Sequence, residues 1–223
     1  EMFNGKYRGK VIDNVDPLML GRIVPMVPAV SDQLLSWALP AAPFAGSGVG
    51  FFALPPVGAN VWIEFEGGDA NYPIWTGCFW GEDEAPAQPA LPTTFMIKTQ
   101  LATLSINDLT GELRLETKTP AGFQTVVLNA EGVKLSSDTV SVTITRQSIE
   151  LTHTGSTGTV APEGITLASG AASVKITPDA IDIANGAAGA HFTPANIGLK
   201  NGAASVVLSP ASVSLNDGAL EVI

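Results

Sequence analysis

The chain has 223 residues, a formal net charge of −10, 45% hydrophobic residues and only 14% charged ones. With 23 glycines and 16 prolines, this composition is typical of a turn-rich β protein rather than a helical one. The acidic excess argues against nucleic-acid phosphates or an anionic membrane surface as partners. No signal-peptide pattern and no apolar run of about 18 residues is found, so we expect a protein made in the cytoplasm.

The first predicted elements are short strands separated by glycine and proline. They cover residues 7–15, 18–27, 51–54, 61–66 and 72–79. Prolines and glycines between residues 31 and 50 exclude a helix of any length there. Five short strands of this kind predict a small closed or partly open barrel. Cys78 lies in the apolar run 74–80, so we expect a buried, inert thiol.

Three segments of this region resemble the OB-fold domain of the central spike proteins of contractile injection systems. They read LMLGRIVPMVP, WALPAAPFAG and ALPPVGANVWIEFEGGDANYPIWTGCFWG. The family includes phage baseplate assembly protein V and the VgrG spikes of type VI secretion. The most specific piece is PPVGANVWIEFEGGDANYPIWTG, which follows the family pattern P-x-x-G-x-x-V-x-x-x-F-E-x-G-D and then P-[VI]-x-x-G. The resemblance implies an OB fold over this region and a homotrimer that ends in a triple-stranded β-helix.

An acidic, proline-rich stretch at residues 82–94 predicts a linker. We therefore expect an OB-fold domain with a short N-terminal arm at residues 1–81 and a second domain at residues 95–223. The linker is too short for the lysozyme domain that some relatives insert at this point.

A repeat of sixteen residues organises the last stretch of the chain, from Ala161 onward. Its corners are marked by Pro162, Pro178, Pro194 and Pro210 and by Gly170, Gly186, Gly202 and Gly218. Each unit holds two apolar pairs with members two residues apart, such as Ile165/Leu167 and Val174/Ile176. This alternation predicts two strands per unit with one buried face. Glycine would supply positive φ at one corner, and proline would fix the bend at the other.

Two large apolar side chains per strand are too few for one chain to enclose a core alone. Three identical chains around a common axis would bury both, so we predict an intertwined trimeric β-helix. In it, each strand would pair its amides with a strand of a neighbouring chain, which leaves no lateral edge open. About 16 strands per chain at ~4.7 Å spacing predict a needle of roughly 75 Å. The predicted trimer-core residues are Val133, Leu135, Val142, Ile144, Ile149, Leu151, Ile165, Leu167, Val174, Ile176, Ile181, Ile183, Phe192, Ile197, Leu199, Val206, Leu208, Val213 and Leu215.

No set of residues is spaced for catalysis or for metal binding, so we predict neither an enzyme nor a cofactor or metal site. His191 occupies an outward-facing slot of the repeat and His153 occupies a corner, so both are expected at the surface. Some family members bind iron through an H-x-H pair near the C-terminus, and this sequence has no such pair. The carboxylates expected on a solvated face or in the linker are Glu64, Glu66, Asp69, Glu82, Asp83 and Glu84.

The function we expect is that of a homotrimeric, membrane-piercing central spike at the tip of a contractile tail or injection machine. Incorporated into such a tail-like particle, it would contact the target cell envelope. About six residues precede the barrel, so the hub on which the OB fold docks should be a separate protein. The predicted tip platform consists of Leu220, Val222 and Ile223, and the resemblance to VgrG implies a PAAR-type cap there. The alternatives are an end that frays or folds back, and a trimeric tail fibre or adhesin that binds a cell-surface receptor.

Overall fold

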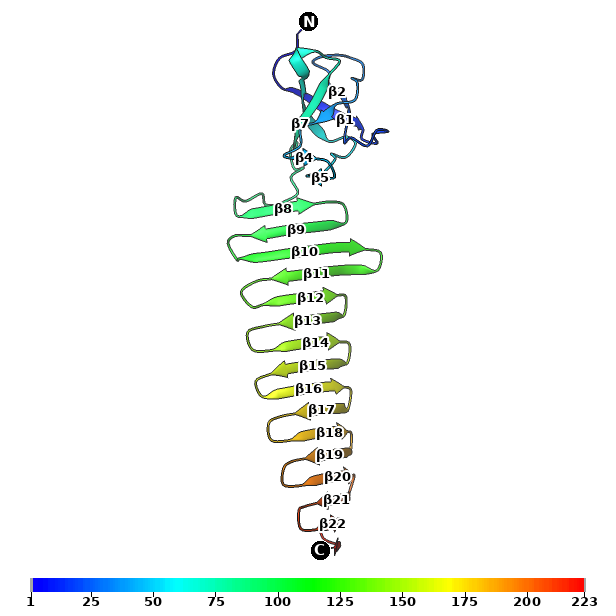
Figure 1. The fold of residues 1–223 in the computed structure, drawn as a ribbon, viewed down its shortest axis with the longest axis vertical. Coiled ribbons are helices and arrows are strands. Elements are labelled where there is room, and N and C mark those ends of the chain that lie inside the picture. The colour runs from blue at the N-terminus through cyan, green and yellow to red at the C-terminus, as the bar shows by residue number, and fades with distance from the viewer. Residues whose placement is uncertain (1, 223) are drawn as a thin grey trace. The chain divides into compact units, whose positions relative to one another are not determined.

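The computed structural model describes residues 2–222, with side chains through Leu220, and divides the chain into two compact units, 1–85 and 86–223. The regular secondary structure of both units is almost entirely β-strand (Figure 1). The only other regular element in the described residues is the short 3₁₀ turn η1 (Glu66–Gly68). No helix of this part of the chain has the length and hydropathy needed to cross a membrane. The prediction of an all-β fold is confirmed.

The N-terminal unit contains a five-stranded sheet in the order β2-β1-β6-β7-β3, together with a separate hairpin of β4 and β5. The strands are β1 (Tyr7–Asp13), β2 (Val24–Met26), β3 (Leu39–Pro40), β4 (Ala45–Gly46), β5 (Val49–Gly50), β6 (Asn60–Phe65) and β7 (Pro73–Phe79). Alternate residues of β6 point inward, as its sequence predicts. The buried hydrophobic core consists of Val11, Ile23, Val27, Ala38, Val61, Ile63 and Phe65.

Three predictions for this unit are wrong. Residues 51–54 form no strand, and Phe51 and Phe52 are exposed. Pro55 and Pro56 follow them directly and supply no amide donors for a ladder. Of the predicted strand at 18–27, only β2 is regular. Cys78 is exposed rather than buried. Its burial was inferred from the apolar run 74–80, but successive residues of a strand point to opposite faces, and a register shift between Trp62 and Ile63 further disturbs the pairing of β7.

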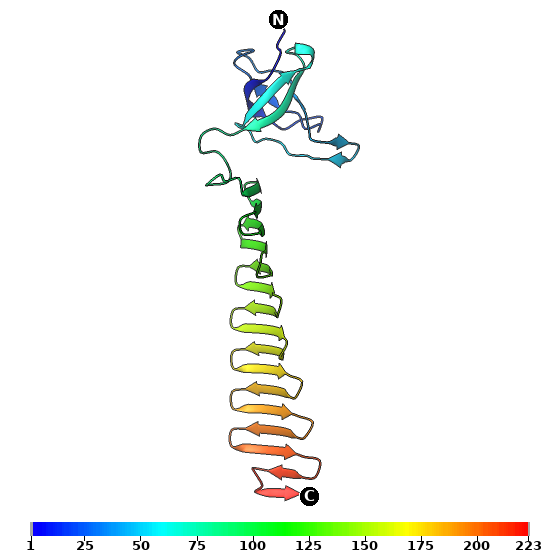
Figure 2. The ribbon, with the colours of Figure 1, turned by 90° about the vertical axis from the view of Figure 1, so that its left-hand side faces the viewer.

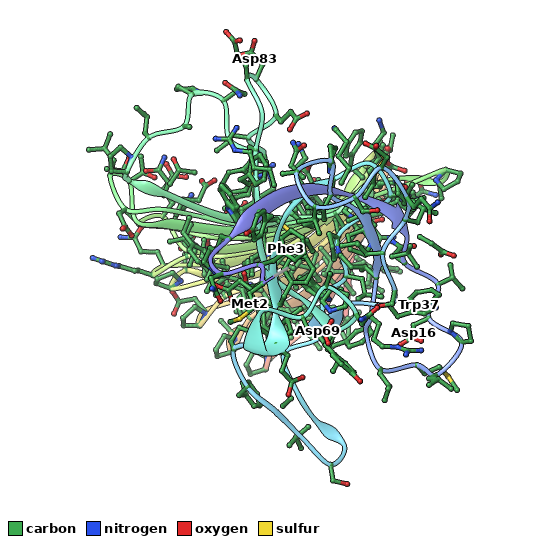
Figure 3. The ribbon with its side chains drawn as sticks, turned by 90° about the horizontal axis from the view of Figure 1, so that it is seen from above. Met2, Phe3, Asp16, Trp37, Asp69 and Asp83 are labelled. Carbon is green, nitrogen blue, oxygen red and sulfur yellow. The ribbon has the colours of Figure 1, made fainter. Side chains whose placement is uncertain are left out.

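The residues ahead of β2 fold as a loop around one carboxylate. Asp16, whose side chain is 2% exposed, forms a salt bridge of 2.6 Å with Arg22. It also accepts backbone N–H groups from Leu18 at 2.9 Å and Leu20 at 2.8 Å. The Arg22 guanidinium in turn lies 5.3 Å from the ring centroid of Trp37, and Figure 3 shows Asp16 and Trp37 on the same side of the unit. The bond from Arg22, followed by the backbone donors, lowers the pKa of Asp16 well below its ordinary value.

Replacing this carboxylate, as in Asp16→Asn, should lower the melting temperature of the N-terminal unit at pH 7. A neutral amide loses the charge-assisted bond to Arg22 and accepts fewer of the loop's N–H groups. Because the folded-state pKa is depressed, the stabilisation is fully present above the unfolded carboxylate pKa of about 3.9 and is lost progressively as pH falls from there toward the folded-state pKa. Thermal unfolding at pH 7 and at pH 3 checks this. The difference between wild type and variant should shrink at pH 3, and an equal difference at both pH values would contradict it.

The C-terminal unit is a single antiparallel sheet of sixteen strands, in which each strand pairs with the next in the chain. This matches the predicted strand number. In chain order the strands are β8 (Thr94–Lys98), β9 (Ala102–Asn107), β10 (Glu112–Thr119), β11 (Gly122–Leu128), β12 (Val133–Ser137), β13 (Val140–Ile144), β14 (Ile149–His153), β15 (Ser156–Ala161), β16 (Gly164–Ser169), β17 (Ala172–Ile176), β18 (Ile181–Asn185), β19 (Ala188–Phe192), β20 (Ile197–Asn201), β21 (Ala204–Leu208), β22 (Val213–Leu215) and β23 (Leu220–Val222). The sheet narrows along the chain, from eight residues in β10 to three in β23 (Figure 1).

Two kinds of turn produce the sixteen-residue period. The glycine corners at Gly170, Gly186 and Gly202 are two-residue hairpin loops, and these three glycines have φ between 56° and 59°. A positive φ at the first loop residue matches the right-handed twist of the flanking strands. Gly218 instead lies in a four-residue loop between β22 and β23. The proline corners at Pro178, Pro194 and Pro210 are four-residue turns, as between Thr177 and Ala180, where the N–H of Thr177 donates to the carbonyl of Ala180 at 2.8 Å. The corner at Pro162 is a two-residue loop between β15 and β16. One turn of each kind and two five-residue strands make up the repeat.

The predicted pairing of amides between different chains is wrong. Every ladder of the C-terminal unit joins strands of the same chain that are consecutive in sequence. Turns of two and four residues return the chain directly beside the strand it has just left, so a hairpin forms before another chain can pair. Hydrogen bonding along the sheet is therefore satisfied within one chain. What remains without a partner in the C-terminal sheet is one of its two faces, not a strand edge along its length.

Candidate assembly face

Large apolar side chains form two parallel columns along one face of the C-terminal sheet. In the β16–β17 hairpin, Ile165 pairs with Ile176 and Leu167 with Val174. Directly opposite residues of an antiparallel pair share a face, and the next ladder continues the same columns. The first column runs through Phe95, Ile106, Leu113, Leu128, Val133, Ile144, Ile149, Val160, Ile165, Ile176, Ile181, Phe192, Ile197, Leu208 and Val213. The second runs through Ile97, Leu104, Leu115, Val126, Leu135, Val142, Leu151, Gly158, Leu167, Val174, Ile183, Ala190, Leu199, Val206, Leu215 and Leu220.

These columns, called the apolar face below, contain all of the predicted trimer-core residues. Sequence reasoning missed Val160, although it occupies the repeat slot of Ile176 sixteen residues later. It also left out the members on β8 to β11. The wider β10–β11 hairpin, with strands of eight and seven residues, interrupts the sixteen-residue spacing there.

The apolar face is uncovered. Leu167 is 52% exposed, Ile183 45% and Leu199 46%. All buried hydrophobic residues in the described part of the chain belong to the N-terminal unit. The chain exposes 15215 Å² in total, whereas a compact 23.0 kDa monomer exposes roughly 9,600 Å². A sheet with no buried core of its own needs another surface against this face.

Gly158 and Ala190 are the two small residues of the second column. Gly158 is buried, and a Cβ added there would lie 3.1 Å from Cδ2 of Leu167 and 3.5 Å from Cδ1 of Leu151. The two leucines therefore lean over the glycine from both neighbouring strands. Ala190 shares β19 with Phe192, the largest residue of the repeat units, which stands in the first column. The face thus stays apolar without a break.

The opposite face of the sheet is polar. Lys175 pairs with Asp182, and Asp182 with His191, whose Nδ1 lies 2.5 Å from the Asp182 carboxylate. Both side chains of this histidine–aspartate pair are about half exposed. His153 lies at the end of β14, opposite Ser156. Within residues 2–222 the structure places no three His, Cys, Asp or Glu side chains together as a metal site.

Three of the six predicted carboxylates of the N-terminal unit accept hydrogen bonds or form an ion pair. Glu64 pairs with Lys6 at 3.0 Å, and Asp69 accepts two bonds from Asn71. Glu84 accepts bonds from Gly81 and Asn60, which ties the first residues after β7 to the barrel. Glu66 belongs to η1, and Glu82 and Asp83 are exposed. None of these carboxylates is within bonding distance of another in the interactions described.

The predicted tip platform is only partly described. Leu220 is 57% exposed and pairs with Leu215. Val222 lies on β23 opposite Val213, but its side chain and the whole of Ile223 lie outside the described residues.

A five-stranded OB unit followed in the same chain by a long sheet with one apolar face agrees with the architecture that the resemblance to spike proteins implies. Comparison with family models agrees, because residues 7–80 match the type VI secretion system/phage-baseplate injector OB domain. The N-terminal unit belongs to that family, and its resemblance to contractile-injection spikes and its OB fold are confirmed. This match over residues 7–80 supports a spike-type baseplate protein. A search of curated proteins finds no match.

Proposed function

We propose that three copies of the chain pack their apolar faces around a common axis and form the rigid needle of a central spike. The observation that carries this proposal is the exposed apolar face of the C-terminal sheet. None of the buried hydrophobic residues in the described part of the chain belongs to that sheet. Threefold packing places every column residue in a dry interior, and each large aliphatic side chain then contributes roughly 1.5–3 kcal/mol of burial energy. The polar faces, with Lys175, Asp182 and His191, remain in water.

The action of such a needle is mechanical rather than enzymatic, without cofactor or bound metal. Contraction of a sheath would drive the spike through the target cell envelope ahead of a tube. A sheet hydrogen-bonded along its whole length within each chain, with three chains locked by one interior, can unfold only when all three separate, which favours slow unfolding. The narrowing from β10 to β23 fits a body that widens an opening as it advances.

The partners in this proposal lie at the two ends of the spike. The OB unit would dock on a separate hub protein at the end of the tube. At the other end, exposed Leu220 would form part of an apolar platform for a PAAR-type cap. The protein would be made in the cytoplasm, assembled into a tail-like particle and delivered to the envelope of the target cell.

The stoichiometry is tested by light scattering together with an unheated SDS gel of the full chain. We expect a particle of three times 23.0 kDa that resists SDS until it is heated. A monomer in both measurements would overturn the needle. Puncture itself is tested by dye release from vesicles on contraction of intact particles with and without the spike.

A further inference from the structure

A stretch without charge runs through the N-terminal unit. Residues 37–63 contain no Asp, Glu, Lys, Arg or His, although the chain carries a net charge of −10. The β4–β5 hairpin lies in this stretch and projects away from the barrel (Figure 2). Its exposed apolar residues include Phe44 at 61% and Val49 at 66%. No sheet partner besides β4 and β5 themselves is present for this hairpin in the described residues.

A hollow of about 680 Å³ lies between the hairpin and the barrel. Its other wall is the loop Met19–Gly21, and Trp75 with its neighbours on β7 forms part of the lining. Met19 is 87% and Phe52 75% exposed. No charged residue lines the hollow.

The walls of this hollow are held in place. Asp16 binds the N–H groups of Leu18 and Leu20, which fixes the loop that presents Met19. Phe52 lies close to Gly21, since a Cβ there would be 3.3 Å from Cε2 of Phe52. The Trp75 indole donates to the carbonyl of Gly21 at 3.1 Å. A large apolar surface built on fixed backbone is typical of a contact with another protein.

We propose that the hairpin and the hollow form a contact between the N-terminal units of neighbouring copies of this chain. Copies of the chain that each carry a net charge of −10 repel one another, so a contact between copies is favoured at a surface without charged residues. This inference rests on the proposed trimer, which tethers three N-terminal units to one needle. Tethering of this kind gives effective concentrations of the order of millimolar, so a modest apolar contact suffices.

Hydrogen exchange of the full-length protein, read by mass spectrometry on peptides that cover residues 40–54, tests the contact. A solvated two-stranded hairpin opens readily and should exchange fast, whereas a hairpin covered by a neighbour should be protected. We expect protection in the wild type and an exchange rate at least tenfold higher in Val49→Glu. The matched control is Val57→Glu, because Val57 is exposed to a similar extent, 61% against 66%, but lies outside the hollow.

The oligomeric mass of each variant is measured alongside. A trimer whose hairpin exchanges equally fast in wild type and Val49→Glu overturns this contact and leaves the needle intact. Protection that appears only after the tube-end hub protein is added assigns the surface to the hub and also overturns it. A monomeric wild type overturns the needle and this contact together.

Discussion

Ile181→Asp should abolish trimer formation. Ile181 stands in the first column between Ile176 and Phe192, so the substitution places three carboxylates at one level of the proposed axis. Each chain loses roughly 1.5–3 kcal/mol of burial, and a buried, unpaired charge costs several kcal/mol more. Size-exclusion chromatography with light scattering at micromolar concentration should show loss of the trimer peak in favour of monomer or aggregate.

The control for this variant is Ala184→Asp. Ala184 lies on the same strand, β18, but on the polar face, where it pairs with Ser173 and Gly189. The Ala184→Asp substitution introduces the same charge into the same strand and should leave the trimer intact. If both variants dissociate, strand stability rather than the apolar face explains the result. If Ile181→Asp remains a trimer, the face is not the subunit contact.

The register of the C-terminal sheet could be predicted because its signals are local and repeated. Apolar pairs two residues apart define which face each strand buries, and Gly170 and its equivalents mark the reversals. Once Ile165 and Val174 are assigned to one face, a one-residue slip would move the whole set to water, so the columns are strongly specified. The N-terminal barrel was predictable through its motif, since residues 7–80 match a known domain.

The same pattern could not predict whether each strand pairs with a strand of its own chain or with one from another chain. An apolar face needs cover in either arrangement, and alternation alone does not distinguish hairpins within a chain from strands supplied by another chain. The loop around Asp16 was missed for a related reason. Leu18 and Leu20 resemble strand residues, but the carboxylate of Asp16 accepts their amides instead, and that competition depends on a folded geometry with Arg22.

Gly164→Ala should be among the most damaging small substitutions in the sheet. Gly164 has φ of +142°, in the region that favours glycine, and pairs with Ala161 across a tight turn. A Cβ there would overlap the carbonyl oxygen of Ile176 and lie 3.2 Å from Cα of Thr177. These are backbone atoms that cannot rotate away. Strained backbone costs about 1–3 kcal/mol for each residue, and displacement of the β17 strand adds to this, so we expect roughly 3 kcal/mol or more per chain.

Gly170→Ala is the matched comparison, because Gly170 also has positive φ, 56°, but its Cβ would meet open space. It should cost only about 1–2 kcal/mol per chain, the penalty for a left-handed residue. Thermal unfolding followed by circular dichroism distinguishes the two, at one protein concentration because a trimer's midpoint depends on it. Equal midpoints would mean that the turn at Gly164 rearranges freely. The residues that replace Gly164 one and two repeats later, Ala180 and Asn196, are accommodated because their turns close through Thr177 and Thr193 instead.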